Sequence, residues 1–355
     1  MVAAFPADPA QLTAEWLGEA VGGEVTSFDI DQIGVGVGLL GRLYRVSLEG
    51  QNVPASVVAK FPTLDEGARM NVVEHLNFYR NEVNFYRDVA GQTPIATPMV
   101  YFAEHDPDSG DFALILEDLG DRRMCDQVAG CAIADAKVAI DAMVDQHAAW
   151  WGSDRFEAHP WIPRYSDPPF PQVLAGMFKQ SWPRALDIVG GQLADAYRDF
   201  GDRFPDLIEW FMNAGCEPPL TLGHGDYRLD NMFFATKDGQ APITLVDWQI
   251  CCRIRGGYDL GYFISQSLST DERREHESSF RDRYLEGLAK KGIDYPEDSF
   301  DNDYRRTTAW CFIYPVVATG QIEITNERHR ALIQGITDRA IQAIEDNDAL
   351  ELLPT

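Results

Sequence analysis

The spacing of hydrophobic positions changes along the chain, from strand-like in the first third to helical in the remainder. Between residues 25 and 61, runs such as RLYRVSLE and SVVAKF are rich in β-branched and aromatic residues, which predicts β-strands. The segments PMVYFAEHD and DFALILEDLG flank the turn PDSGD and predict a β-hairpin. This order of elements disfavours a regular β-α-β-α parallel sheet and favours an α+β fold.

Helical periodicity begins within the first third and dominates after it. Asp8, followed by proline, predicts the start of a short helix that runs to about Val21. A second helix is predicted over 66–89, where apolar residues recur at four- and three-residue steps. Further helices are predicted over 134–152, 271–291 and 327–346. Because the texture changes near residues 118–121, we expect two lobes, 1–118 and 119–355.

Composition places the chain among ordinary globular proteins, with 45% hydrophobic and 24% charged residues in a length of 355. The net charge is −26, from 56 acidic and 30 basic residues. This balance disfavours binding to nucleic acid or to an anionic membrane through bulk charge. It favours either a solubility or saline-habitat feature or the attraction of cationic substrates.

Localisation follows from features that the sequence lacks. The first residues carry neither a basic region nor an apolar core typical of a signal peptide. Apolar runs do not approach the eighteen or so residues that a membrane span needs. The six cysteines form no C-x-x-C pair and are expected to be small core residues in a reducing compartment. A cytoplasmic protein is therefore expected.

The glycine-rich segment GVGVGLLG allows three interpretations. A Rossmann fingerprint needs a helix directly afterwards, whereas a second strand is predicted at that position. A Walker loop needs Gly-Lys-Ser or Gly-Lys-Thr, which is absent from the segment. The third is a hairpin in which the main-chain N–H groups around Gly36 and Gly38 close over phosphates, and the alternative to all three is a plain turn.

Lys60 ends the apolar strand SVVAK, where an ammonium is costly to bury unless it meets an anion. It could instead be an edge lysine that reaches into water. On the following predicted helix, Glu82 and Glu74 are both candidate carboxylate partners, and helical spacing alone does not choose between them.

The segment HGDYRLDN concentrates polar groups, with Asp226 and Asn231 five residues apart and Asp247 ending a later apolar strand. Such oxygen ligands suit Mg²⁺ bound together with phosphates, and a carboxylate free of metal could accept a proton from a hydroxyl. A metallohydrolase using His224 and the nearby aspartates is a rival, but it leaves the glycine segment and Lys60 unexplained. A purely structural role in turns and caps fits Asp230 best.

In this order, the glycine loop, strand lysine, helix glutamate, H-G-D-x-x-x-x-N segment and strand-end aspartate resemble the aminoglycoside phosphotransferase and choline kinase-like superfamily. H-G-D in place of H-R-D and VDWQ in place of D-F-G are typical of it. The segments LYRVSL, NEVNFYRDV, LILEDLG and GYDLGYFI are most similar to its ecdysteroid-kinase-like (CHK kinase-like) branch. The resemblance spans about residues 25–330.

This resemblance implies a bilobal protein-kinase-like fold, with an antiparallel-sheet N-lobe containing one key helix and a mainly helical C-lobe. It implies that Lys60 holds nucleotide phosphates and that Glu82 orients Lys60. It also implies that the backbone of Glu117 to Leu119 receives the adenine base. Asp259 would brace the catalytic loop, and His147 would be a satisfied core histidine.

The resemblance further implies that Asp226 is the catalytic base and that Asn231 and Asp247 are magnesium ligands. The expected function is transfer of the γ-phosphate of ATP or GTP to a hydroxyl of a small molecule; the alternative is a catalytically silent nucleotide-binding module. The acceptor stays open, because the acidic runs fit solvated faces and the aromatic run DYRRTTAWCFIYP fits either helix core or an apolar pocket. Arg253 and Arg255 could add positive potential or be ordinary surface arginines.

Overall fold

The computed structural model describes residues 5–34, 41–65, 69, 76–321 and 327–354. The chain forms two compact units, one made of Met1–Arg123 with Ala235–Ile250 and the other of Met124–Phe234 with Cys251–Thr355. The predicted lobes are continuous ranges, whereas these units are discontinuous, because residues 235–250 return to the first unit.

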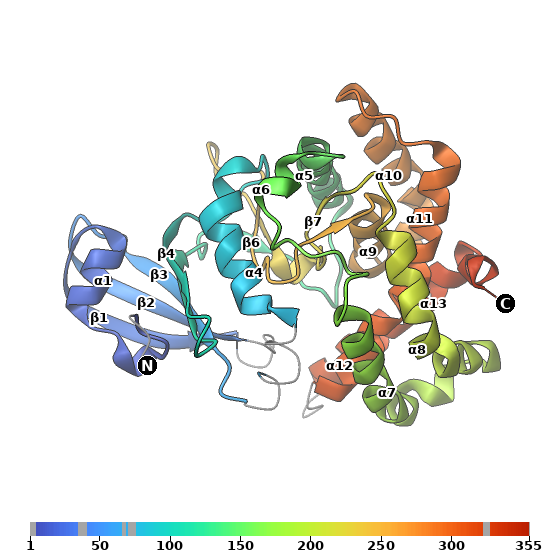
Figure 1. Cartoon of the computed structure of the whole chain (residues 1–355), viewed down its shortest axis with the longest axis horizontal. Coiled ribbons are helices and arrows are strands. Elements are labelled where there is room, and N and C mark those ends of the chain that lie inside the picture. Colours follow the sequence, from blue (N-terminus) through green and yellow to red (C-terminus); the bar gives the residue numbers. More distant parts are fainter. Residues whose placement is uncertain (1–4, 35–40, 66–68, 70–75, 322–326, 355) are drawn as a thin grey trace. The chain divides into compact units, whose positions relative to one another are not determined.

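A five-stranded antiparallel sheet forms the centre of the first unit (Figure 1). Its strands, in spatial order, are β1 (Glu24–Ile33), β2 (Gly41–Gln51), β3 (Ser56–Pro62), β5 (Phe112–Glu117) and β4 (Val100–His105). The predicted hairpin is confirmed, since β4 and β5 pair antiparallel with His105 opposite Phe112. In the β3–β5 pair Lys60 lies opposite Leu114, so the lysine belongs to a central strand.

The N-terminal segment forms two short helices instead of the single helix that the sequence predicts. Asp8 caps only the 3-10 turn η1 (Pro9–Gln11), because Leu12 is extended. Thr13 then accepts from the Trp16 N–H at 3.1 Å and starts α1 (Ala14–Val21). Figure 1 shows α1 beside the sheet, where Leu17 joins the apolar core.

The remaining elements of the first unit include the helix that follows β3. The prediction over 66–89 is confirmed from Phe78 onward, and residues 66–68 and 70–75 lie outside the described part. The helix α4 (Phe78–Asn84) continues as the π-helical turn η3 (Phe85–Val89) and the 3-10 turn η4 (Ala90–Gln92). The returning segment carries β9 (Ile243–Leu245), and Leu245 donates to the Ala96 carbonyl at 2.9 Å.

The second unit is mainly helical, which confirms the α+β expectation. Its helices are α5 (Ile133–Trp150), α6 (Arg155–Ala158), α7 (Phe170–Val189), η5 (Gly190–Gln192), α8 (Asp195–Gly215), η6 (Leu229–Asn231), α9 (Gly257–Ser267), α10 (Thr270–Lys290), α11 (Glu297–Trp310), α12 (Ile313–Gln321), α13 (Glu327–Asp346) and η7 (Ala349–Leu352). Its strands β7 (Thr221–Gly223) and β10 (Cys252–Ile254) pair antiparallel, and a third strand is β8 (Met232–Phe234). The short strand β6 (Arg123–Met124) lies at the boundary between the two units, which falls between Arg123 and Met124. The predicted helices over 134–152, 271–291 and 327–346 are therefore confirmed as α5, α10 and α13.

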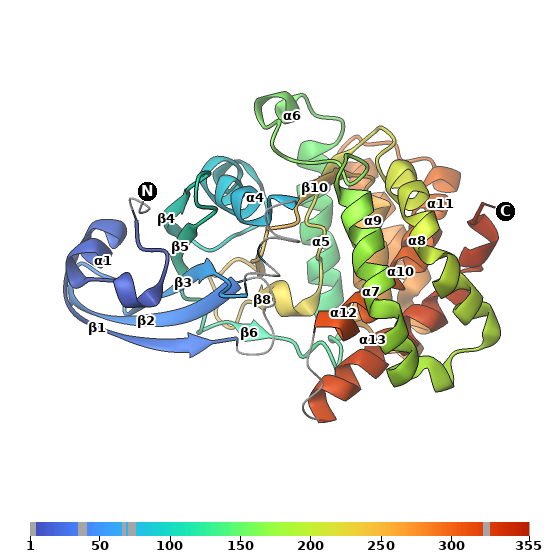
Figure 2. The ribbon, with the colours of Figure 1, turned by 60° about the horizontal axis from the view of Figure 1, so that its bottom comes forward.

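Helix α9 is the buried centre of this unit, with every residue from Gly257 to Ser267 buried. It contacts α5, α10, α11 and α13 (Figure 2). A Cβ added at Gly261 would lie 2.9 Å from the Thr307 side chain on α11, so glycine permits this close approach. A helix buried on all sides offers a rigid base for the polar groups that it presents. In the part of the chain that the structure describes, no helix is long and apolar enough to cross a membrane.

Candidate active-site residues

Three charged side chains of the first unit form a group that we call the lysine cluster: Lys60, Glu82 and Asp247. The Lys60 Nζ lies 2.7 Å from Glu82 Oε2 and 2.9 Å from Asp247 Oδ1. The side chains of Lys60 and Glu82 are 9% and 1% exposed, whereas that of Asp247 is 28% exposed. Lys60 therefore has an anionic partner on each side, and its helix partner is Glu82; Glu74 lies outside the described residues.

Electrostatics keep the lysine of this cluster charged. Burial by itself lowers the pKa of Lys60, but the carboxylates of Asp247 and Glu82 outweigh it and leave that pKa above its ordinary value. Burial raises the pKa of Glu82, an effect that Lys60 opposes and Asp247 reinforces. Two carboxylates therefore compete for one ammonium, and Asp247 is the more exposed of them.

Asp247 follows β9 with a backbone φ of 65°, in the left-handed region that non-glycine residues rarely adopt. The next residue, Trp248, is fully buried and stacks on Phe85 of η3, with ring centroids 3.9 Å apart and an interplanar angle of 7°. This stack links the segment that carries Asp247 to the helical segment that carries Glu82. Sequence patterns do not reveal it, because 163 residues separate the two rings.

The predicted base-binding segment, Glu117 to Leu119, follows β5. The Glu117 N–H donates to the Met99 carbonyl at 2.8 Å, and the Leu119 carbonyl accepts from Arg122 at 2.9 Å. An incoming base would therefore have to use other main-chain groups of this segment. Asp118 lies between Glu117 and Leu119 in the sequence, and its carboxylate accepts from Arg45 at 2.6 Å and from Ser56 at 2.7 Å. Asp118, which the sequence did not single out, thus ties this segment to β2 and β3.

The second unit carries the polar segment from His224 to Asn231, which we call the aspartate loop. Asp259 of α9 accepts from the His224 N–H at 2.7 Å through Oδ2 and from the Gly225 N–H at 3.0 Å through Oδ1. Its Oδ2 also lies 3.2 Å from His147 Nε2. Burial by itself raises the pKa of Asp259, but these hydrogen bonds and the two histidines lower it below its ordinary value. Asp259 therefore braces the loop, and His147 is a satisfied core histidine, as expected.

Asp226 lies inside this loop with its side chain 18% exposed. The Tyr262 hydroxyl on α9 donates to Asp226 Oδ1 at 2.8 Å, and the Asn231 Nδ2 donates to Oδ2 at 3.0 Å. The Arg228 Nε lies 3.2 Å from Oδ2, and the same guanidinium lies 3.5 Å from Asp230. The structure thus brings Asp226 and Asn231 together and adds two contacts, from Tyr262 and Arg228, that the sequence did not single out.

A second support reaches the aspartate loop from outside it. The Gln127 Oε1 accepts from the Leu229 N–H at 3.0 Å, and its Nε2 donates to the Gln266 carbonyl at 2.7 Å. Arg339 of α13 donates to the carbonyls of Gln127 and Gln266 at 2.7 and 2.9 Å. The last helix therefore stabilises the loop indirectly, a role that its amphipathic sequence does not reveal.

The remaining sequence-based candidates fall into other places. Gly36 and Gly38 lie outside the described residues. Arg253 donates to the carbonyls of Phe156 and His159, and Arg255 pairs with Asp303 at 2.6 Å, so both side chains have structural partners within the second unit.

The aromatic run of the C-terminal part is mostly helix core: Tyr304, Trp310 and Phe312 are buried.

His224 has a role within the aspartate loop, because its Nδ1 accepts from the Asp226 N–H at 3.2 Å. Among the described residues no group of three or more His, Cys, Asp or Glu side chains is arranged to hold a metal ion. The six cysteines, all among the described residues, form no disulfide, and five of them are buried.

Solved structures with a similar fold are small-molecule kinases and related proteins. A protein of Ralstonia eutropha JMP134, provisionally named an aminoglycoside phosphotransferase, has a TM-score of 0.57 at 17% identity, covering 96% of this chain and 98% of that chain. Choline kinase from Cryptosporidium parvum Iowa II has a TM-score of 0.56 at 12% identity, covering 92% of each chain. Ethanolamine kinase from Plasmodium vivax has a TM-score of 0.53 at 10% identity, covering 91% and 83%.

These similarities confirm the predicted protein-kinase-like fold. A model of the ecdysteroid kinase-like family matches residues 36–293, and the chain belongs to that family. Comparison with curated proteins gave no match. The match ends before α11, so the three helices α11, α12 and α13 lie beyond it.

Proposed function

We propose that the protein transfers the γ-phosphate of ATP to a hydroxyl of a small molecule. The lysine cluster is the observation that carries this proposal. A buried, permanently charged lysine between two carboxylates is suited to phosphate binding, because a polyphosphate can replace the more exposed carboxylate as its partner. Membership of a kinase-like family supports the same chemistry.

The roles of the residues follow from the demands of phosphoryl transfer. The acceptor O–H donates its proton to Asp226 while the acceptor oxygen forms a bond to the γ-phosphorus. The bond from that phosphorus to the β–γ bridging oxygen breaks, and its electron pair leaves with ADP. Because the transition state is loose, Asp226 acts mainly by orienting the acceptor and takes the proton late. Lys60 neutralises charge on the nucleotide, and Glu82 orients Lys60.

Each unit offers one oxygen donor of the kind that magnesium prefers. Asp247 supplies carboxylate oxygens on a partly exposed side chain. Asn231 directs its Nδ2 to Asp226, which leaves its amide oxygen as the atom of the right type for a hard cation. We therefore propose Asp247 of the first unit and Asn231 of the second unit each as a magnesium ligand, and the ion would supply charge neutralisation at the phosphates when bound.

A binding assay and a transfer assay test this proposal together. Thermal shift with ATP in Mg²⁺ is followed by ³¹P NMR of reactions containing choline, ethanolamine, 1-amino-2-propanol, an aminoglycoside or a hydroxylated steroid. We expect stabilisation by MgATP and a phosphate ester of at least one acceptor, with Asp226→Ala as the control that binds without transfer. Stabilisation without any ester would favour the catalytically silent nucleotide-binding module. No stabilisation by MgATP would overturn both functions.

A further inference from the structure

The hydrogen bond from Tyr262 gives the two oxygens of Asp226 different surroundings. Oδ2 accepts a hydrogen bond from the Asn231 amide at 3.0 Å and forms an ion pair with Arg228, whose Nε lies 3.2 Å away. Oδ1 has the Tyr262 hydroxyl at 2.8 Å. Two groups of the same loop therefore lie at Oδ2, whereas Oδ1 has a single neighbour among the described residues, the tyrosine, and a carboxylate oxygen has about two acceptor positions, so Oδ1 can accept a second donor.

Tyr262 itself is held rigidly. The residue is 4% exposed, and its ring stacks on Tyr314 of α12, with centroids 4.2 Å apart and an interplanar angle of 9°. The Tyr314 hydroxyl shares a 2.6 Å hydrogen bond with that of Tyr258, which also accepts from Trp310 Nε1 at 2.9 Å. Burial, reinforced by the Asp226 carboxylate, raises the pKa of Tyr262 well above its ordinary value. Tyr262 is therefore a neutral donor in a fixed position.

Resting on the proposed phosphotransfer, we propose that Oδ1 of Asp226 is the atom that takes the acceptor proton and that Tyr262 is the positioning residue that fixes it. The Tyr262 hydroxyl and the acceptor hydroxyl would share Oδ1, each donating one hydrogen bond to it. During transfer the acceptor proton moves to Oδ1, the new O–P bond forms, and ADP leaves with the electron pair of the broken bond. Tyr262 keeps its own proton throughout.

This arrangement makes part of the C-terminal region necessary for the reaction. Tyr262 lies within the segment matched by the family model, but its stacking partner, Tyr314, lies beyond residue 293. The ring of Tyr314 limits how far the Tyr262 ring can turn, and so limits the direction from which its hydroxyl approaches Asp226.

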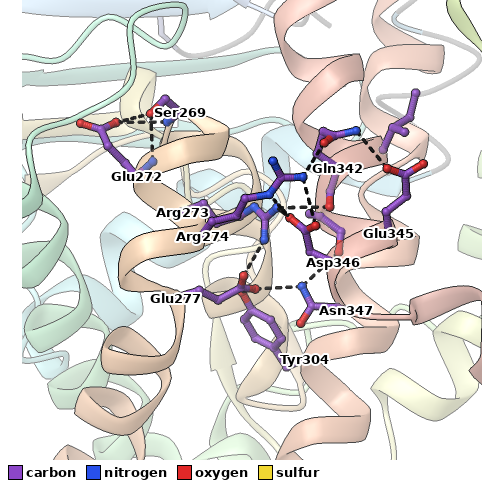
Figure 3. Close-up of polar contacts among 12 residues, drawn as sticks. Ser269, Glu272, Arg273, Arg274, Glu277, Tyr304, Gln342, Glu345, Asp346 and Asn347 are labelled. Atoms are coloured by element: carbon purple, nitrogen blue, oxygen red, sulfur yellow. Dashed lines mark hydrogen bonds and ion pairs between the residues drawn. The ribbon is translucent and has the colours of Figure 1, made fainter.

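The test replaces Tyr262 with phenylalanine, which keeps the ring and removes only the hydroxyl. Tyr304→Phe is a matched control, because the buried Tyr304 hydroxyl also donates to a carboxylate of the second unit, Glu277, at 2.6 Å (Figure 3). Each variant is assayed with ATP and the best acceptor of the screen, and its melting temperature is measured. We expect similar losses of melting temperature, and a fall in kcat of about tenfold to a hundredfold for Tyr262→Phe alone, with KM for ATP unchanged.

The outcomes separate this inference from the proposed function. Wild-type kcat in Tyr262→Phe overturns the inference and leaves phosphotransfer intact, whereas an inactive wild-type protein overturns the proposed function. An equal fall of kcat in Tyr304→Phe shows a general effect of stability and also overturns the inference. If Tyr262→Phe does not fold, Tyr314→Leu decides: it removes the stacked ring and keeps the Tyr262 hydroxyl, so an unchanged kcat contradicts the proposal.

Discussion

Asp226 and Glu277 are two carboxylates of the second unit that contact the same three kinds of polar residue: a tyrosine, an asparagine and an arginine. These partners are Tyr262, Asn231 and Arg228 for Asp226, and Tyr304, Asn347 and Arg273 for Glu277. Figure 3 shows the second set, in which Tyr304 and Asn347 both donate to one oxygen of Glu277 and Arg273 to the other.

The two sites differ in where their donors come from. Around Glu277 the tyrosine belongs to α11, the asparagine follows α13, and Arg273 of α10 is 1% exposed and also pairs with Asp346. That carboxylate holds three helices together. Around Asp226 two of the three partners, Asn231 and Arg228, come from within five residues of the same loop, and the arginine is 28% exposed. The same kinds of polar group therefore connect separate helices around Glu277, whereas around Asp226 they mainly fix the carboxylate within its own loop.

Replacing Asp226 by alanine should have a larger effect on catalysis than any of the substitutions that follow. Because a positioned general base contributes about 10²- to 10⁴-fold, we expect kcat for phosphoryl transfer to fall by roughly a thousandfold. Binding of MgATP, measured by isothermal titration calorimetry, should be retained. Full turnover by this variant would contradict the comparison, because Asp226 would then be as structural as Glu277.

Glu277→Ala should lower the stability of the protein and leave kcat almost unchanged. Removing this carboxylate leaves the buried Tyr304 and Arg273 groups short of a partner, and we expect a loss of about 2–3 kcal/mol in the free energy of unfolding. Urea titration measures this loss, and kcat of the folded variant should stay near the wild-type value. A large fall of kcat without loss of stability would show that the two carboxylates do not divide their roles in this way.

The stability of an Asp259→Asn variant should depend on pH differently from that of the wild-type protein. The folded-state pKa of Asp259 is lowered, so its carboxylate contributes stability above the unfolded-state pKa of about 3.9, and this contribution is lost as the pH falls through the folded-state pKa. We expect the variant to be about 2 kcal/mol less stable near pH 7, with the difference narrowing below about pH 4. Urea midpoints across this range test it, and a constant difference would argue against an ionised Asp259 as the brace.

Asp247→Ala extends the comparison to a carboxylate that pairs with a lysine. We expect the affinity for ATP in Mg²⁺ to fall by about tenfold or more, equivalent to about 1.4 kcal/mol. Titrations with and without EDTA provide the readout: the wild-type protein should lose affinity when the chelator is added, and the variant should lose little. Equal dependence of both proteins on the metal would count against a ligand role for Asp247.

Much of the fold could be predicted from periodicity, because the hydrophobic pattern of a strand or a long helix lies within its own consecutive residues. The β4–β5 hairpin follows from two strand-like runs around a turn, and the helices α5, α10 and α13 were predicted at nearly the same positions. The N-terminal helix was predicted too long, because a local break at Leu12 leaves no strong signal in the pattern. The return of residues 235–250 to the first unit depends on packing, and short strands do not specify their distant partners.

By itself, the sequence determined the order of chemical groups: a lysine ending a strand, a glutamate on the next helix, an aspartate loop and a strand-end aspartate. Motif spacing carries this information because it is local and ordered along the chain. Only the tertiary structure decided that Lys60 pairs with Glu82 and Asp247, and that Tyr262 donates to Asp226 from 36 residues away. Such contacts depend on how buried helices and strands pack, since packing sets the distance between side chains that the sequence keeps apart.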